Sequence, residues 1–366
     1  MKKIIVTLML LAVAMTAGAF DFSVVTPQGQ TLYYTIVSGT NVKVVAPSGN
    51  SWDFYESNMP EGSLQIPATV VHEGTTYTVV AIDNKAFAEC TGITEVHIPS
   101  SVTSIGIRAF ANASAMTSLT IEEGLQSIGS TAFISCTSLE TITLPSTLTH
   151  IGLGAFNNTG YYNNTDNWSS EHTLSIGHWL IHVSNTVSDE LVVEGGTVGI
   201  ADNAFYYCRF LHGVTLPASL RYVGSSVFKE CEVLDTVRVR ATTPPAMGDE
   251  CFVNAPVKAV VVPCGSLTAY RAVAPWNTLP LLEAACPVGI ESVDGATSQQ
   301  VTVFVFDGGI EVRGAERNEA AVYDMMGRRV AWVAQASNSQ RMSLPAAGLY
   351  VLRLSDGQAV KVTYFK

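Results

Sequence analysis

The sequence predicts a mainly β protein, with a solenoid of parallel stacked coils and little helix followed by a β-sandwich. The main observation is a 23-residue unit, seen from Ile128 to His150, that recurs along the middle of the chain. Such a period indicates a solenoid, because one unit cannot bury its apolar face alone. Stretches of alternating polarity before and after the repeats predict further strands. With 366 residues, the chain should form two or three units.

Residues 1–19 are expected to be a secretory signal peptide. Lys2 and Lys3 precede an apolar run that ends at Ala17-Gly18-Ala19, so cleavage is expected after Ala19. Removing both lysines makes the formal net charge of −11 still more negative. Such a charge argues against nucleic acid or an anionic membrane as partner. No later run approaches the roughly 20 apolar residues of a membrane span.

Residues 20–80 lack the repeat and are expected to form an N-terminal β cap over the first coil. An uncapped solenoid would expose its core and a sheet edge. Turn signals lie at residues 27–29, 47–50 and 73–74. They separate three alternating stretches, Leu32–Val37, Val42–Val45 and Tyr77–Val80.

Each repeat is marked by a phenylalanine, which usually follows an alanine. Within the unit, Ile142 and Leu144 should point inward from a short strand, which Pro145 ends because it lacks an N–H donor. Stacked coils place like residues above like, so the rings should form a continuous apolar column. The ring positions are Phe87, Phe110, Phe133, Phe156, Phe205, Phe228 and Phe252. The wide gap between Phe156 and Phe205 indicates an insertion at about residues 157–190.

Residues 81–263 resemble the BspA-like class of bacterial leucine-rich repeat. The resemblance rests on the order Ile-x-x-x-Ala-Phe-x-x-Cys-x-x-Leu, followed by a short apolar strand and usually Pro. It implies a leucine-rich-repeat solenoid with little helix on its convex side. It also implies adhesion to extracellular-matrix or plasma proteins, although such repeats occur in proteins of many roles.

The seven cysteines do not suggest a disulfide framework. Four of them, Cys90, Cys136, Cys208 and Cys231, follow a repeat phenylalanine by three residues. They are expected to be small buried side chains, although Cys208 and Cys231 lie in neighbouring coils and could bridge. Cys251, Cys264 and Cys286 lie outside this ladder, and their disulfide state is open.

The insertion has an Asn-rich first part and then a β-hairpin that should turn at Gly177-His178. Its aromatic residues make it a candidate contact site, because loops on rigid scaffolds tend to carry function. The alternative is that these side chains only pack the hairpin onto the coil. The candidates are Tyr161, Tyr162, Trp168 and Trp179.

Residues 264–288 are expected to form a C-terminal cap and linker, with Ser266 capping a helix over 267–274 and Trp276 helping to cover the open end. Residues 289–366 then predict seven short strands, which suggest an Ig-like β-sandwich. The stretches VYDMMGRRV, LPAAGLYVLRL and KVTYFK resemble the C-terminal sorting domain of type IX secretion substrates. This resemblance implies contact with that secretion machinery, with Lys361 or Lys366 as the basic residue of the closing motif. The alternative is an ordinary Ig-like accessory domain.

No catalytic motif is found. His178-x-x-x-His182 has helical metal-ligand spacing, but it lies in a strand pattern, where residues four apart are about 13 Å from each other. We therefore expect no enzyme activity, no cofactor and no metal. The positive feature is a row of outward strand positions, although polar β-branched residues are also ordinary on a solvent-facing strand. The row consists of His97, Thr120, Thr143, Thr215 and Arg238.

The sequence thus predicts a secreted or cell-surface protein of a Gram-negative outer membrane that contacts a host extracellular protein or another cell through its repeat face. An alternative is capture of glycan by the aromatic insertion, and a third is an unrecognised hydrolase. The sequence does not identify the ligand, the binding face or the oligomeric state.

Overall fold

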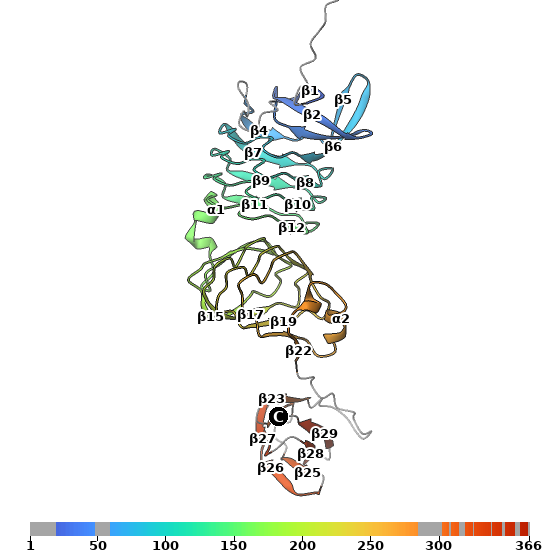
Figure 1. Cartoon of the computed structure of the whole chain (residues 1–366), viewed down its shortest axis with the longest axis vertical. Coiled ribbons are helices and arrows are strands. Elements are labelled where there is room, and N and C mark those ends of the chain that lie inside the picture. Colours follow the sequence, from blue (N-terminus) through green and yellow to red (C-terminus); the bar gives the residue numbers. More distant parts are fainter. Residues whose placement is uncertain are drawn as a thin grey trace, which may run out of the picture. The chain divides into compact units, whose positions relative to one another are not determined.

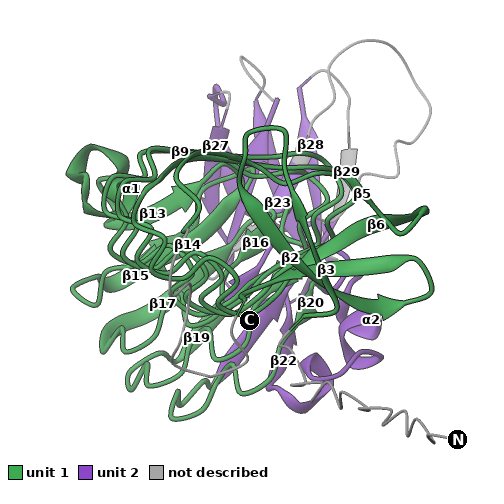
Figure 2. Cartoon of the chain, turned by 90° about the horizontal axis from the view of Figure 1, so that it is seen from above, with its two compact units in different colours: residues 1–237, 245–258 green, residues 238–244, 259–366 purple. Residues whose placement is uncertain are grey.

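The computed structural model describes residues 20–47, 59–284, 302–306, 309–314, 319–324, 326–337, 339–345, 348–355 and 359–364. The chain divides into two compact units, shown in green and purple in Figure 2. The first contains Met1–Val237 and Pro245–Lys258, and the second contains Arg238–Pro244 and Ala259–Lys366. The segments predicted as a signal peptide and as a linker after residue 284 lie outside the described residues.

The first unit begins with antiparallel strands. Three of the five correspond to the predicted alternating stretches, and β5 and β6 turn at Glu73-Gly74, where both residues have positive φ. Leu32, Tyr34, Val42 and Val44 from this part are fully buried and join the core of the coils. The strands are β1 (Phe22–Val25), β2 (Thr31–Ser38), β3 (Asn41–Val45), β5 (Thr69–His72) and β6 (Thr75–Ile82).

The coils that follow build two parallel sheets, visible as stacked strands in Figure 1. The first, here called the face sheet, contains three predicted apolar strands, β7 (Ile93–Ile98), β9 (Ser118–Ile121) and β11 (Thr141–Thr143), and begins with β4 (Gly62–Gln65), which was not predicted. The second, here called the side sheet, continues from β6 with two-residue strands at the start of each unit, which the sequence did not predict. These strands are β8 (Ser104–Ile105), β10 (Ser127–Ile128) and β12 (His150–Ile151).

The third side of each coil is a turn around the phenylalanine, held by backbone bonds to the next coil. The Phe87 N–H donates to the Ala109 carbonyl at 2.7 Å, and the Glu89 N–H donates to the Ala111 carbonyl at 2.8 Å. The residues two before and two after each phenylalanine have positive φ, such as Lys85 and Glu89. The left-handed backbone conformation therefore recurs in each coil. It is part of the turn whose backbone N–H groups donate to the next coil.

The predicted stacking of the phenylalanine rings is confirmed. Centroids of successive rings from Phe87 to Phe156 are 5.1, 5.2 and 5.3 Å apart, with interplanar angles of 15° or less. Phe205, Phe228 and Phe252 form a second stack, with spacings of 4.8 and 5.3 Å. The expectation of one continuous column is wrong, because the column is divided at the insertion.

Both sheets stop at the insertion and start again after it. The insertion holds α1 (Gly160–Asn163), η1 (Thr165–Asn167) and the predicted hairpin of β13 (Thr173–Ile176) and β14 (Trp179–Val183), which turns at Gly177-His178. A new side sheet continues from β14 through β16 (Gly199–Ile200), β18 (Tyr222–Val223) and β20 (Ala246–Met247). A new face sheet holds β15 (Ser188–Val192), β17 (Phe210–Leu216) and β19 (Thr236–Val239).

The cysteine ladder is buried and reduced, as the spacing indicated. Cys90, Cys136, Cys208, Cys231 and Cys251 are free thiols. The Cys136 thiol donates to the Phe110 carbonyl at 3.1 Å, and the Cys231 thiol does the same to the Phe205 carbonyl. Burial raises the pKa of Cys136 to about 12. Because Cys208 and Cys231 are both free thiols, they do not bridge in this structure. Cys264 is disulfide-bonded. Cys286 lies outside the described residues.

The second unit begins with the strand β21 (Ala259–Val262), a short helix α2 (Leu267–Arg271), η2 (Trp276–Thr278) and β22 (Leu281–Glu283). Tyr270 and Trp276 are buried and meet edge to face, and the Tyr270 hydroxyl donates to the Ala241 carbonyl at 2.7 Å. The Ser266 side chain does not cap the helix. The Glu283 carboxylate accepts from the Leu267 N–H, the first of the helix, at 3.4 Å, and from the preceding Gly265 N–H at 2.7 Å. The helix start is therefore capped by a residue distant in sequence.

Seven strands of the second unit form two antiparallel sheets, in the orders β23-β24-β27 and β26-β25-β28-β29. Val303, Ile310 and Val312 from one sheet share a buried core with Val322 and Leu352 from the other. The β-sandwich expected from the sequence is confirmed. Its strands are β23 (Thr302–Phe306), β24 (Gly309–Arg313), β25 (Ala320–Asp324), β26 (Arg329–Val333), β27 (Ser339–Ser343), β28 (Gly348–Leu354) and β29 (Ala359–Tyr364).

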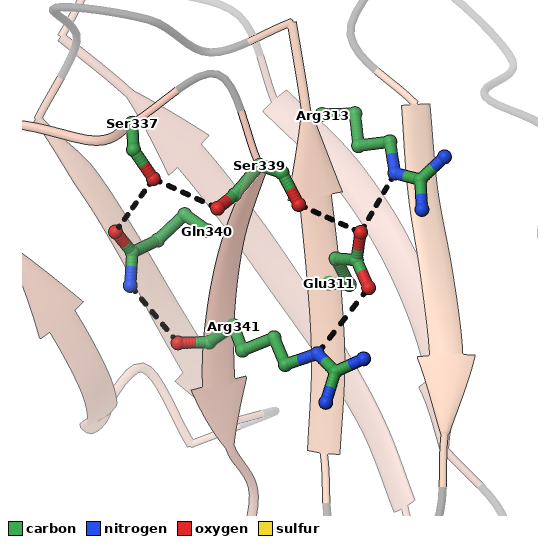
Figure 3. A network of polar contacts seen from close by, with 6 residues as sticks. All are labelled: Glu311, Arg313, Ser337, Ser339, Gln340 and Arg341. Carbon is green, nitrogen blue, oxygen red and sulfur yellow. Dashed lines mark hydrogen bonds and ion pairs between the residues drawn. The ribbon is translucent and has the colours of Figure 1, made fainter.

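A polar network links β24 and β27 on the side of the sheet opposite Ile310 and Val312 (Figure 3). Glu311 accepts from the Ser339 hydroxyl at 2.7 Å and pairs with Arg313 at 2.7 Å and Arg341 at 3.4 Å. These donors lower the pKa of Glu311 to about 2. The network therefore satisfies a carboxylate that is only 9% exposed.

Candidate functional site at the interruption of the stack

The clearest irregularity in the repeat array is the place where the insertion separates β12 from β16. In stacked coils the residue after the side-sheet strand is glycine, because a Cβ would meet the preceding coil: at Gly129 it would lie 2.7 Å from the Gly106 carbonyl carbon. Gly106, Gly152, Gly224 and Gly248 have the same constraint. After the insertion this position is Ala201, which is 2% exposed. Ala201 therefore marks the coil at which the close backbone approach seen at the glycines is interrupted.

A histidine and a carboxylate face each other across this interruption. His150 Nε2, at the end of the first block, lies 3.1 Å from both carboxylate oxygens of Asp202, in the second block. The Asp202 N–H donates to the Ile151 carbonyl at 3.0 Å, and its Oδ1 accepts from the Ser225 N–H at 2.7 Å. The bond to Asp202 raises the pKa of His150 above its ordinary value of 6.5, outweighing the opposing effect of burial.

An aromatic pair forms the opposite part of the same region. The rings of Trp179 and Tyr222 are 6.1 Å apart and nearly parallel, at 7°. Between them in the side sheet lies Gly199, where a Cβ would lie only 2.5 Å from the Trp179 ring. The tryptophan can reach Tyr222 because Gly199 has no side chain. Trp179 is only 4% exposed, so most of its surface packs against the protein.

His150 and the aromatic pair line a partly open cavity of about 200 Å³ on the side sheet. Its walls include Thr149, His150, Trp179, Tyr222, Ser225 and Met247. It combines apolar ring surface with a histidine, hydroxyl groups and glycine backbone, which are groups that orient a small polar ligand. The cavity is therefore a candidate for a small-molecule site in the first unit.

The other aromatic residues of the insertion mainly pack against each other. The rings of Tyr162, Trp168 and His182 meet edge to face, with centroids 5.5 to 5.6 Å apart. Trp168 Nε1 donates to the Tyr162 carbonyl at 2.9 Å, and the Tyr161 hydroxyl donates to the Ser175 carbonyl at 2.8 Å. Burial lowers the pKa of His182. These contacts lie within the insertion, and all three aromatic residues of its first part stay partly accessible.

The outward row on the face sheet exists only in part. His97, Thr120 and Thr143 are in register on β7, β9 and β11, and His97 pairs with Glu122 at 3.2 Å. The row does not continue to Thr215 and Arg238, because the face sheet ends at β11 and restarts at β15. The expectation that Thr215 faces solvent is wrong. Its side chain is only 7% exposed, and it pairs with Val192 of the neighbouring strand. Arg238 is exposed on β19.

Three residues of the interruption were missed by sequence reasoning, Asp202, His150 and Tyr222. The signal for the first was present, because Ala201 breaks an otherwise regular run of glycines. Tyr222 gave no signal, since serine, histidine and tyrosine all occupy this outward position in different coils.

The described residues contain no group of three or more His, Cys, Asp or Glu side chains suited to a metal ion. Among the described residues, the His150 ring bonds to the Asp202 carboxylate and to no hydroxyl or thiol nucleophile. None of the described helices is long and apolar enough to cross a bilayer. The interruption thus brings together a histidine–carboxylate pair and an aromatic pair beside one small cavity.

Comparison with known proteins agrees with the repeat pattern. A family model described as the BspA type leucine rich repeat region matches residues 73–177 and 189–274 in six copies, more than half of the chain. No curated protein matches. Similar solved structures include a leucine-rich repeat protein of T. pallidum, TpLRR, at 21% identity over 70% of this chain and 94% of that chain, with a TM-score of 0.32. Others are a leucine-rich repeat protein from Bacteroides capillosus (29% identity, 36% and 91% coverage, TM-score 0.32) and a leucine rich cell surface protein from Faecalibacterium prausnitzii (18%, 72% and 94%, TM-score 0.26).

Proposed function

The chain belongs to the BspA-type leucine-rich repeat family, and we propose that it is an exported, non-enzymatic surface protein that binds a host extracellular protein or another cell. The observation that carries this proposal is the flat row of His97, Thr120 and Thr143 on consecutive parallel strands. Repeat arrays commonly use such extended sheet faces for recognition. The insertion flanks this face through α1, where the Tyr161 N–H donates to the Leu139 carbonyl at 2.7 Å.

A binding assay of the whole mature chain against immobilised extracellular-matrix and plasma proteins tests the proposal. Exchanging Thr120 and Thr143 for arginine should weaken saturable binding at least about tenfold, a loss of about 1.4 kcal/mol, because both side chains are exposed at the centre of the row. The control is Thr268→Arg, an equally exposed change on α2. Equal binding by the row variant and the control would refute this use of the face.

A second candidate is glycan capture, which the cavity beside Trp179 and Tyr222 favours. In the same assay with immobilised polysaccharides, Trp168→Ala and Trp179→Ala should then abolish binding while the row variant still binds. Unfolding curves of each variant separate loss of the site from loss of the fold. An unrecognised hydrolase is the third reading, and product release in the absence of binding would favour it.

We also propose the export route and the domain boundaries. Residues 1–19 are the signal peptide, 20–80 the N-terminal β cap, 81–263 the repeats, 264–288 the cap and linker, and 289–366 a type IX sorting domain. The seven-stranded sandwich and the similarity of its last strands to such domains support this proposal. The destination would be the outer membrane of a Gram-negative cell.

Secretion of two forms of the chain tests the route. In a bacterium with type IX secretion, the full chain should reach the cell surface, while a chain ending at residue 288 should remain in the periplasm. The repeats are complete in both forms, so binding by the periplasmic material serves as the control for folding. Surface display of the shorter chain would contradict a sorting role for residues 289–366.

A further inference from the structure

The turn after Phe205 presents an exposed aromatic cluster. Tyr206, Tyr207 and Phe210 are 48%, 39% and 62% exposed. The corresponding turns of other coils carry small, aliphatic or polar residues at the two tyrosine positions. These are Ala88 and Glu89, Ala111 and Asn112, Ile134 and Ser135, Asn157 and Asn158, and Lys229 and Glu230. The coil fold does not require the aromatics, because its neighbours form the same turn without them.

Tyr207 also occupies an unfavourable backbone conformation. Its φ is +65°, and its N–H donates to the Lys229 carbonyl at 3.0 Å, as the turn demands. The same position holds Asn112, Asn158 and Asn254 in other coils, and asparagine adopts positive φ more readily than a bulky residue. Among the described residues, Tyr207 is the one Phe, Tyr or Trp with positive φ. Such backbone strain tends to be retained at functional positions.

Neighbouring groups hold the Tyr207 ring in place. Its centroid is 6.0 Å from that of Tyr206, and the Arg209 guanidinium lies over it at 4.6 Å. Arg209 donates to the Tyr207 hydroxyl at 2.8 Å and pairs with both oxygens of Glu232 at 2.8 and 2.9 Å. The cluster is therefore ordered before any partner arrives, which lowers the entropy cost of binding.

We propose that Tyr206, Tyr207, Arg209 and Phe210 form a second contact surface, for a protein segment that is apolar at its centre and basic at its rim. Tyrosine and arginine dominate the energetically important centres of protein interfaces. Arg209 pairs with Glu232 and Lys229 pairs with Glu250 at 3.0 Å, while Glu230 accepts from Asn254 at 2.8 Å. The rim therefore carries three carboxylates against two cations. This acidic rim complements a basic partner and repels a second copy of the chain, whose formal net charge is −11.

The surface is separate from the row on β7, β9 and β11, so the two proposals can fail independently. A phage-displayed random peptide library, selected on the full mature chain and depleted on the Tyr207→Asn variant, provides the probe. Enriched peptides should combine apolar residues with Lys or Arg. Their affinity should fall at least tenfold with Phe210→Thr, a variant on which they were not selected, and should decrease with rising salt.

The stability of the same variants separates binding from packing. Because asparagine is natural to this turn, Tyr207→Asn should keep the melting temperature within about 2 °C of the parent value or raise it. Ser135→Asn, the same residue at the same turn position of another coil, should leave both stability and peptide binding unchanged. A fall of melting temperature by several degrees in Tyr207→Asn alone would assign the ring to packing and overturn the proposal. Enrichment of acidic peptides, competition by soluble oligosaccharide, or self-association lost in the variant would overturn it equally.

Discussion

Replacing Phe133 by alanine is expected to lower the free energy of unfolding by about 3–5 kcal/mol, the usual cost of removing a buried ring. Phe133 is 0% exposed and lies between Phe110 and Phe156, with centroid distances of 5.2 and 5.3 Å. The cavity left by the substitution would be bounded by two further rings fixed in their own coils. Collapse around it is therefore limited. Denaturant unfolding followed by circular dichroism measures the change.

The matched control for this experiment is Phe252→Ala. Phe252 ends the second stack, contacts Phe228 and is partly exposed, so its loss should cost clearly less than that of Phe133. A cost below about 1 kcal/mol for Phe133→Ala would mean that the ring column contributes little to stability. The repeat array would then depend mainly on its backbone ladders.

The second large effect is expected for Gly129→Ala, which should destabilise the array by about 1–3 kcal/mol, the range for overpacking a filled site. The new Cβ would lie 2.7 Å from the Gly106 carbonyl carbon and from the Ile107 nitrogen. Both are backbone atoms of the preceding coil, so no side chain can move aside. The coils would have to separate locally, which strains the hydrogen bond from the Gly129 N–H to the Ile105 carbonyl at 2.8 Å.

Gly195→Ala provides the comparison, because no atom lies within 4 Å of a Cβ built at Gly195 and its φ is not positive. Alanine at such a site should leave the free energy of unfolding nearly unchanged or raise it by about 0.4–1 kcal/mol. Thermal unfolding of both variants in the same buffer gives the difference. Equal stability of the two variants would show that the glycine run is not a requirement of close stacking.

The repeat architecture could be predicted because each coil obeys local rules. The spacing of Phe87, Phe110, Phe133 and Phe156 predicted the ring column, and the apolar alternation around Ile142 predicted the face strands. The turn at Gly177-His178 and the seven strands of the sandwich were predicted on the same basis. In these segments, residues close in sequence largely determine the backbone conformation. In the solenoid, each coil adopts the same conformation as the coil on which it stacks.

The site could be predicted only in part, because exposure depends on which coil lies next to a residue. Thr143 is the last row position of its sheet, Thr215 is buried opposite Val192, and neither fact can be read from the alternation of its strand. The two-residue strands of the side sheet were missed for a similar reason. Such short strands have almost no pattern of their own and exist through pairing with neighbouring coils.

The sequence by itself determined the coil: its period, its buried column, its glycine run and the sandwich that follows. The sequence also located the insertion, but only the tertiary structure decided the meeting of His150 with Asp202 and of Trp179 with Tyr222 there. The physical reason is that local conformation is set by a few adjacent side chains, whereas these pairs join residues more than 40 positions apart. Their contact depends on how the chain folds between Phe156 and Phe205, which are 49 residues apart and belong to different blocks of coils.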